Sequence, residues 1–264
     1  MSSAEHYLDV NRALWNNKTQ YHLQSDFYEV EAFKKGKSSL NSIELEQLGD
    51  VRNKTLLHLQ CHFGQDTLSW ARMGASVTGI DFSDEAIKAA RHLAQELNIE
   101  ADFIQSNVYD VKLARQFDII FTSYGVIGWL PDLEKWAQVI ANHLKPGGEF
   151  HLIEFHPVVW MFDNDFQYIQ YSYFNREDII EEVHGSYADR SAPIVGQSVS
   201  WNHSLDEVLG ALLRQGLRIE HFAEYDYSPY NCFVNTVQIA ENQWQIKGLE
   251  GKIPMVYALK ARKY

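Results

Sequence analysis

The sequence has 264 residues but only two cysteines, Cys61 and Cys232, so it does not indicate a disulfide scaffold. No stretch approaches the roughly 18 consecutive apolar residues that a membrane-spanning helix needs. The first residues, MSSAEHYLDV, also lack the basic segment and apolar run of a secretory signal. Together these absences predict a cytoplasmic protein that works in a reducing compartment.

Positive charge is scarce as well. Lys and Arg number 23 against 35 Asp and Glu, which gives a net charge of −12. The densest basic cluster, at residues 34–37, is short and is typical of a solvated loop. An acidic chain is a poor electrostatic match for nucleic acid or for an anionic membrane, so neither is expected as a partner.

Glycine is missing where a phosphate-binding turn would need it. A short apolar run, Leu56–Leu59, predicts a buried strand, and a helical pattern and a second strand, Val77–Ile80, follow. The turn after the first strand contains only Gly64, whereas a dinucleotide site needs G-x-G-x-x-G so that backbone can approach a pyrophosphate. The second strand stops at Asp81, whose carboxylate can accept hydrogen bonds from both hydroxyls of a ribose. The pattern favours a nucleoside cofactor without phosphate over NAD or FAD.

Five segments in order resemble the motifs of the class I S-adenosylmethionine-dependent methyltransferases. They are HLQCHFG at 58–64, VTGIDFS at 77–83, FIQSNVYD at 103–110, FDIIFTSYGVIGWLPD at 117–132 and LKPGGEFHLI at 144–153. The first motif departs from the family pattern, because His58 stands in place of an acid and Gln60 and His62 in place of glycines. The resemblance covers about residues 50–155 well and the remainder loosely.

The expected fold is α/β and Rossmann-like. Strand candidates alternate with helical patterns such as Asp84–Leu97 and Leu133–Leu144, and Ser83 is placed to cap the first of these helices. The resemblance implies a mostly parallel seven-stranded sheet with helices on both faces and a final antiparallel hairpin from Leu217–Ala223 and Met255–Arg262. The predicted strands of the parallel part are Leu56–Leu59, Val77–Ile80, Phe103–Gln105, Ile119–Ser123 and Glu149–Glu154.

We expect one domain over residues 1–264 with four parts. Residues 1–48 form an N-terminal cap that is helical up to about Glu31, and residues 50–155 form the cofactor-binding core. Residues 156–200 are rich in aromatics and form an inserted substrate lobe, in which alternation over Tyr168–Phe174 suggests antiparallel strands. Residues 201–264 hold the last helix and strands.

The resemblance implies S-adenosylmethionine as cofactor and assigns contacts to it. Asp81, with Phe82 beside it, faces the ribose, Gly64 permits close approach, and Asn107 and Val108 cradle the adenine. The remaining cofactor residues are Gln60 and His62 toward the methionine part, Thr122 and Ser123 near the methyl group, and Trp15, with His22, as part of a lid. The alternatives are an ordinary polar strand end for Asp81, a turn glycine for Gly64, local packing for Gln60 and His62, and contacts from the backbone alone for Thr122 and Ser123.

The residues expected to meet an acceptor molecule are Tyr124, Trp160 and Tyr230. Glu154 and His156 alternate at the end of a strand, so either could act as a base toward the acceptor, or both could only shape the pocket. No metal is expected, because His58, Cys61 and His62 crowd one strand and its turn without a further ligand cluster. His151 and His203 are expected to be structural.

The predicted function is methyl transfer from S-adenosylmethionine to a nitrogen, oxygen or sulfur atom of a small molecule, by direct in-line attack. The expected product is S-adenosylhomocysteine, and the protein is expected to act as a monomer or homodimer. Two alternatives remain open: a non-catalytic regulatory protein that binds S-adenosylmethionine, and an NAD-dependent oxidoreductase, which the missing glycines disfavour.

Overall fold

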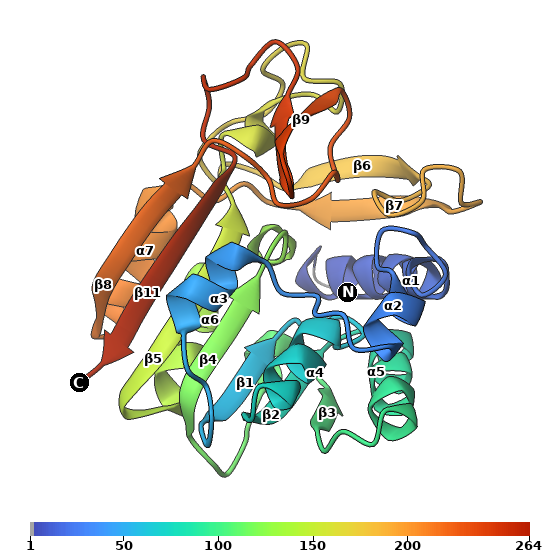
Figure 1. Cartoon of the computed structure of the whole chain (residues 1–264). Helices are drawn as coiled ribbons and strands as arrows, with labels where there is room; N and C mark the ends of the chain where they lie inside the picture. Colours follow the sequence, from blue (N-terminus) through green and yellow to red (C-terminus); the bar gives the residue numbers. More distant parts are fainter. Residues whose placement is uncertain (1–2) are drawn as a thin grey trace.

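The computed structural model describes residues 3–264, and its centre is one seven-stranded sheet (Figure 1). Five neighbouring strands are parallel, and β11 is antiparallel to both of its neighbours. This confirms the predicted Rossmann-like fold with its final antiparallel strands. In spatial order the strands are β3 (Asp102–Gln105), β2 (Ser76–Asp81), β1 (Thr55–Leu59), β4 (Phe117–Ser123), β5 (Leu144–Phe155), β11 (Val256–Lys263) and β8 (Leu217–Tyr225).

Helices cover both faces of the sheet because successive residues of a strand point to opposite sides. Leu57 of β1 packs in the same apolar cluster as α6 (Leu133–His143) and α7 (Leu205–Arg214). Leu56, the preceding residue, packs instead with residues of α3 (Ser42–Leu48) and α4 (Gln65–Arg72). A further cluster seats α5 (Asp84–Glu96) against β3, and Ser83 caps α5 by accepting from Ala86 N at 3.0 Å, as predicted.

The N-terminal helix is shorter than predicted. The chain forms α1 (Ser3–His22), turns, and begins a separate short helix, α2 (Val30–Lys34). A single helix up to about Glu31 is therefore wrong. Glu29 adopts φ of 44°, a left-handed conformation that cannot continue a right-handed helix. The turn brings Tyr28 against Phe63, with ring centroids 4.8 Å apart.

The inserted segment also differs from the prediction. Residues 168–174 form turns with one isolated bridge, and Tyr168 and Phe174 are 59% and 50% exposed. Alternation there did not produce strands, since no partner strand covers these side chains. The antiparallel pair of the lobe is β6 (Ile179–His184) with β7 (Val195–Ser200).

A second small pair, not predicted from the sequence, is formed by β9 (Thr236–Ala240) and β10 (Gln243–Ile246). Figure 1 shows β6, β7 and β9 on the side of the sheet toward which β4 and β5 point, with α1 directly beneath β7. Three short 3-10 turns complete the elements: η1 (Val108–Asp110), η2 (Ile127–Trp129) and η3 (Val159–Met161).

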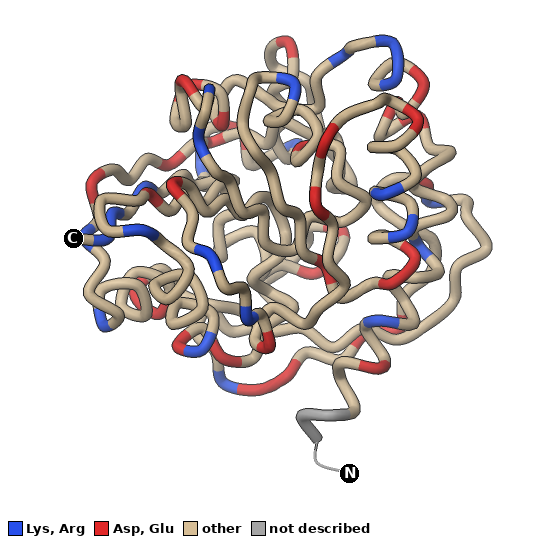
Figure 2. The backbone as a smooth tube through the Cα atoms, turned by 90° about the horizontal axis from the view of Figure 1, so that it is seen from below, with Lys and Arg blue, Asp and Glu red and all other residues tan. Residues whose placement is uncertain are grey.

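Acidic and basic residues alternate along the chain rather than separating into faces. Figure 2 shows both colours interspersed in the view from below. Several basic side chains form an ion pair with a nearby acid, as in the pairs Arg115–Asp102 and Arg52–Asp50. Along residues 3–264, no helix combines the length and the apolar character needed to cross a membrane.

Candidate functional site

A hollow of about 380 Å³, open solvent included, lies at the carboxyl ends of β1, β2 and β3 beneath α1. The strand order reverses between β1 and β4 next to it, and ligands of open α/β sheets bind at this kind of switch point. Its lining residues are Tyr7, Leu8, Asn11, Gln60, Ile80, Asp81, Phe82, Ser106, Asn107, Val108, Trp129 and Leu130.

Asp81 lies at the end of β2 and lines this hollow. Its Oδ2 accepts from His62 N at 2.8 Å and its Oδ1 accepts from Ser83 N at 2.9 Å. Each carboxylate oxygen keeps a further lone pair, so a vicinal diol can still donate to both. Burial raises the pKa of Asp81 to about 6, and these backbone donors oppose that shift.

The turn between β1 and α4 keeps a glycine-type conformation without the glycines. Gln60 and His62 have φ of 57° and 51°, and Gly64 has φ of 80°. Left-handed backbone costs roughly 1–2 kcal/mol at a non-glycine residue. Such strain persists where the surroundings enforce it, and it collects at functional sites. The departure seen in the sequence therefore leaves the backbone path of the turn intact.

Side chains fix this turn from several directions. Gln60 donates through Nε2 to Val126 O at 2.8 Å, while its Oε1 is buried and has no hydrogen-bond partner among the described residues. The close neighbour of Gly64 is a protein ring, because a Cβ at that position would lie 2.6 Å from Phe103. The expected close approach to a cofactor at Gly64 stays a prediction.

At the other end of the hollow, Asn107 caps η1 by accepting from Tyr109 N at 3.3 Å. Asn107, Val108 and Phe82 all line the hollow. These residues were expected around adenine and ribose, and the structure brings them together with Asp81. Their contacts to a cofactor stay predictions.

Thr122 and Ser123, at the end of β4, were expected near the methyl group but do not line the hollow. The Thr122 hydroxyl is buried and finds no hydrogen-bond partner in the part of the chain that the structure describes, and Ser123 Oγ lies 3.4 Å from Asp66 Oδ2. The next residue, Tyr124, turns away through φ of 38° and donates to Glu44 Oε2 at 2.9 Å.

Two histidines meet beside the turn. His22 Nδ1 and His62 Nε2 are joined at 2.8 Å, and His22 Nε2 lies 2.6 Å from Ser186 Oγ in the lobe. Burial lowers the pKa of His62 to about 3 and that of His22 to about 2. Both imidazoles are therefore neutral at physiological pH. The expected lid residue Trp15 packs edge-on against both rings, with centroids 5.4 Å from His62 and 6.0 Å from His22.

Glu154 does not reach toward an open pocket. Its carboxylate accepts from the backbone amides of Gly125, Val126, Ile127 and Phe155. This arrangement holds the turn after β4, and the Val126 carbonyl of that turn holds Gln60. The catalytic assignment of Glu154 stays a prediction, and its geometry favours positioning.

His156 is also engaged by the protein. Its Nε2 lies 2.9 Å from Glu224 Oε1 on β8, and its Nδ1 accepts from Val158 N at 3.1 Å. Burial lowers the pKa of this imidazole, and the neighbouring Glu224 opposes the shift. A base role for His156 stays a prediction, since its two nitrogens are already occupied in this arrangement.

The three residues expected to contact the methyl-acceptor molecule lie in two separate regions of the structure. Trp160 lines a small second hollow with Phe155 and His203. Tyr124 and Tyr230 pack together at 5.1 Å between ring centroids, and Tyr230 accepts from Asn41 Nδ2 at 2.7 Å. Aromatic contacts from Tyr124 to Phe155 and from Phe155 to Trp160 connect the two places.

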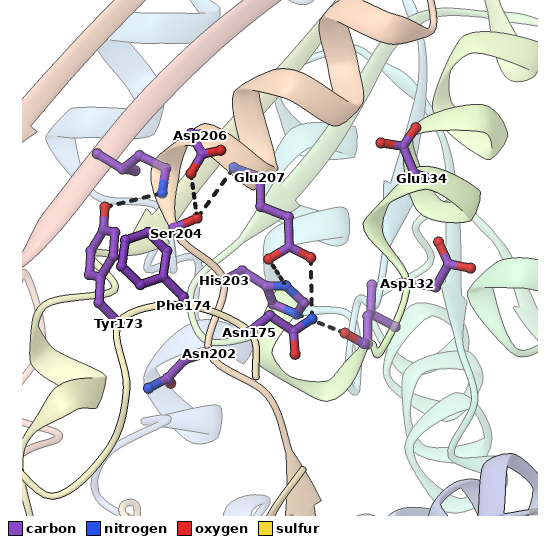
Figure 3. A network of polar contacts seen from close by, with 12 residues as sticks. Asp132, Glu134, Tyr173, Phe174, Asn175, Asn202, His203, Ser204, Asp206 and Glu207 are labelled. Atoms are coloured by element: carbon purple, nitrogen blue, oxygen red, sulfur yellow. Dashed lines mark hydrogen bonds and ion pairs between the residues drawn. The ribbon is translucent and has the colours of Figure 1, made fainter. Parts of the chain in front are cut away.

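A polar network ties the lobe to the rim of the first hollow (Figure 3). His203 lies between Glu207 Oε2 on α7, at 3.1 Å, and Leu130 O, at 2.7 Å. Asn202 donates to Ser172 O at 2.7 Å, and Ser204 caps α7 by accepting from Glu207 N. Because Leu130 lines the hollow, this network positions its rim, and His203 is structural as expected.

Three charged residues near the site were not predicted from the sequence. Lys18 is 7% exposed on α1, and Glu44 is fully buried beside Asp66. Burial raises the pKa of Glu44 to about 7 and that of Asp66 to about 6. The sequence did contain a pattern that could have identified Lys18, because this residue lies on one face of the N-terminal helix. That face carries Tyr7, Asn11, Trp15, Lys18 and His22.

Among residues 3–264, no three His, Cys, Asp or Glu side chains gather where they could hold a metal ion. His58 instead bonds Thr67 Oγ1 at 2.8 Å, and Cys61 is a free buried thiol. His151 is buried on β5 and pairs with Glu149, which is the expected structural role. The absence of a metal cofactor stays a prediction.

Comparison with known proteins agrees with this geometry. A family model for a methyltransferase domain matches residues 56–148. A ubiquinone biosynthesis O-methyltransferase of Escherichia coli O6:H1 is 26% identical over 78% of this chain and 81% of that enzyme. The corresponding enzyme of Salmonella arizonae is 35% identical, but the match spans only 39% of this chain and 43% of that enzyme.

Solved structures share the fold at low sequence identity. A methyltransferase from Clostridium acetobutylicum aligns over 92% of this chain and 94% of its own, with a TM-score of 0.61 and 14% identity. One from Mesorhizobium loti aligns over 87% of this chain and 100% of its own, with a TM-score of 0.58 and 20% identity. A glycopeptide N-methyltransferase solved with S-adenosylmethionine covers 83% of this chain and 85% of its own, with a TM-score of 0.53 and 17% identity.

The match of residues 56–148, the sheet order and the position of the hollow at the switch point together support a class I S-adenosylmethionine-dependent methyltransferase.

Proposed function

We propose that this protein binds S-adenosylmethionine in the hollow beneath α1 and transfers the methyl group to a small-molecule acceptor. The single observation that carries the proposal is Asp81, a buried carboxylate with two free lone pairs at the end of β2. It supports a ribose site, because a carboxylate at this point of the fold accepts from ribose hydroxyls. The turn of Gln60, His62 and Gly64 beside it keeps its left-handed backbone despite the strain.

The residues present fit the methyl donor. Asp81 would hold the ribose, Asn107 and Val108 the adenine, and the side of the hollow near Gln60 the methionine part. When bound, the donor supplies a methyl group already activated by sulfonium.

The work of the protein is then mostly positioning. Aligning acceptor and donor can supply roughly 7–11 kcal/mol of the barrier. Trp15 and Trp129 pack edge-to-face at 5.4 Å beside the hollow, and aromatic faces stabilise a cation by about 0.5–2 kcal/mol. The turn that Glu154 holds fixes the Gln60 side of the hollow. These groups orient reactants and exclude water.

An oxygen acceptor is the favoured class. A relative that aligns over 78% of this chain is named as a ubiquinone biosynthesis O-methyltransferase, and so are relatives that align over 39% of it. The fold by itself does not choose the atom, since a glycopeptide N-methyltransferase shares it. The aromatic contacts from Tyr124 through Phe155 to Trp160 support an acceptor with a flat apolar ring.

Two alternatives predict different behaviour. A regulatory protein would bind S-adenosylmethionine without turnover. An NAD-dependent oxidoreductase would change nicotinamide absorbance, but the side chains of Gln60 and His62 occupy a turn where a pyrophosphate needs bare backbone. A cytoplasmic location, a monomer or homodimer, and the absence of nucleic-acid or membrane partners stay predictions from the sequence.

The test is calorimetric titration with S-adenosylmethionine and with S-adenosylhomocysteine, followed by an acceptor screen that measures S-adenosylhomocysteine release. We expect micromolar binding of both ligands, loss of binding in Asp81→Ala, and no change in the exposed control Asp178→Ala. Circular dichroism checks that Asp81→Ala folds. Absence of binding to the wild-type protein would refute the proposed function, and binding without turnover of any acceptor would favour the regulatory alternative.

A further inference from the structure

Lys18 is a buried lysine that has no anionic partner. It is 7% exposed on α1, and its Nζ lies 4.9 Å from the ring centroid of Trp15 and 5.9 Å from that of Trp129. Among the described side chains, those of residues 6–264, no carboxylate lies within ion-pair distance of it, and burial lowers its pKa to about 8. A charge in this position is costly for the folded protein.

Its surroundings offset only part of that cost. Cation–π contacts contribute about 0.5–2 kcal/mol each, less than an ammonium loses when it leaves water. The nearby titratable groups are His22 and His62, whose imidazoles are neutral. An apolar side chain of similar length, such as Met, would fill the same space without a charge to desolvate. Folding alone therefore does not account for a lysine at this position.

The place of Lys18 identifies the missing partner. Trp129, on which Lys18 packs, lines the hollow together with Gln60 and Asp81. Trp15, its other contact, lies edge-on to His62 of the turn. Lys18 does not itself line the hollow, but its ammonium packs on Trp129, beside the end of the hollow formed by the turn of residues 60–64. Asn107 and Val108 lie at the opposite end.

A second donor at the same end also has no acceptor. Trp15 Nε1 is buried without a hydrogen-bond partner in the described chain. Buried polar groups are nearly always paired, so an unpaired N–H beside an unpaired ammonium indicates a ligand that accepts hydrogen bonds and carries negative charge.

Resting on the proposed function, we propose that Lys18 binds the carboxylate of the methionine part of S-adenosylmethionine. The sulfonium and the amino group of that ligand are cationic, so its carboxylate is the only anion that can pair with Lys18. Trp15 Nε1 is placed to donate to the same group. Lys18 is then a specificity-determining residue: it distinguishes ligands with the amino-acid tail from nucleosides without it.

The test compares ligands that differ only in the tail. Wild type, Lys18→Met and the control Lys88→Met, an exposed lysine of α5, are titrated with S-adenosylhomocysteine and with 5′-methylthioadenosine. The second ligand keeps the nucleoside and the sulfur but has no carboxylate. A charge-assisted hydrogen bond corresponds to roughly a 10- to 100-fold change in affinity.

We expect Lys18→Met to weaken the binding of S-adenosylhomocysteine by that factor, and the binding of 5′-methylthioadenosine by less than about threefold. Lys18→Arg should retain most of the affinity, because it keeps the charge. Equal weakening of both ligands, or no weakening of either, would overturn the assignment. If the wild-type protein binds neither ligand, the proposed function fails and this assignment with it.

The ligand-free protein gives an independent readout. If the lysine is retained for a ligand, Lys18→Met should raise the melting temperature of the free protein while reducing the further rise caused by S-adenosylhomocysteine. A lysine kept only for its contacts with the two tryptophans would give the reverse for the free protein, a lower melting temperature on substitution.

Discussion

At the scale of single residues, Gln60 and His62 show that a turn can keep its shape when its glycines are lost. Both adopt left-handed backbone, and both are held from outside. Gln60 bonds Val126 O, and His62 bonds His22 through its ring and Asp81 through its amide. Bonds to distant segments offset the local strain of the turn. A sequence motif records only the residue type and not these bonds.

At position 64, the same turn requires glycine. A Cβ there would lie 2.6 Å from the buried Phe103 ring, in a backbone with φ of 80°. We expect Gly64→Ala to lower the free energy of unfolding by roughly 2–4 kcal/mol, from strain and overpacking together. Gly36→Ala is the matched control, because Gly36 also has positive φ but open space around it.

Urea denaturation measures both variants. The control should cost about 1 kcal/mol, the conformational part alone. Equal costs for the two variants would contradict the role given to Phe103. The structure predicts that replacing Phe103 by Leu partly restores the stability of Gly64→Ala. If Phe103 is not the obstacle, this replacement should restore none of it.

If Asp81 binds the ribose as proposed, cofactor binding should depend on pH. Burial raises the pKa of Asp81 in the folded protein from its ordinary value of 3.8 to about 6. Between these values the folded state holds more protons than the unfolded state, so the free energy of unfolding falls as pH rises from about 4 to 6. Ribose hydroxyls donate to the ionised carboxylate, so ligand affinity changes in the opposite direction and increases with pH.

We therefore expect S-adenosylhomocysteine to bind the wild-type protein roughly tenfold more weakly at pH 5 than at pH 7. Asp81→Asn should bind weakly at both values, with little dependence on pH. Calorimetry across this pH range measures the difference in affinity between the wild type and Asp81→Asn. Both proteins contain the buried Glu44 and Asp66, so the effect of their titration cancels in this difference. A wild-type affinity that is flat from pH 5 to pH 7 would argue against ribose binding by this carboxylate.

At the scale of elements, the ends of β4 and β5 work as one unit. Glu154 at the end of β5 accepts hydrogen bonds from four backbone amides, three of them in the turn that follows β4. That turn begins at Tyr124 and Gly125, both with positive φ, and it leads into η2 beside the hollow. One carboxylate therefore sets the path of a turn that carries Trp129.

Glu154→Gln should lower the free energy of unfolding by about 1–3 kcal/mol, because an amide NH₂ would then face backbone donors. We also expect weaker S-adenosylhomocysteine binding, since Val126 O holds Gln60. The exposed Glu177→Gln is the control. Unchanged stability with a large loss of turnover would instead support the base role predicted from the sequence, as would a changed pH profile of turnover in a stable variant.

At the scale of the whole molecule, α1 joins the lobe to the cofactor-binding core. Asn11 is 1% exposed and bonds both backbone groups of Val199 on β7, at 2.8 and 3.0 Å. It also lines the hollow, as does Tyr7 one turn earlier. The helix therefore closes over the site from above and carries the lobe on its other side (Figure 1).

Asn11→Ala should release this connection. Val199 would keep a buried N–H and C=O without partners, at a cost of about 1–3 kcal/mol. We expect faster hydrogen exchange over residues 195–200 and in α1, together with several-fold weaker S-adenosylhomocysteine binding. Asn142→Ala, on the exposed face of α6, is the control. Unchanged exchange in β7 would show that other contacts hold the lobe.

The local sequence pattern was sufficient to predict those features that depend on residues close together in the chain. Apolar runs and caps predicted the parallel strands, α5 with its Ser83 cap, and the position of Asp81 at a strand end. Alternation failed over Tyr168–Phe174, because a strand also needs a partner strand that the local pattern does not specify.

The sequence by itself determined the order of the parallel strands and the helices between them, and hence the resemblance to methyltransferases and the place of Asp81 at a strand end. Only the tertiary structure decided what faces that site from distant segments: Lys18 on Trp129, His22 on His62, and Glu154 on the turn after β4. The physical reason is that these contacts join residues far apart in the chain. Their distances and burial, which set charge and strain, exist only once the sheet has assembled.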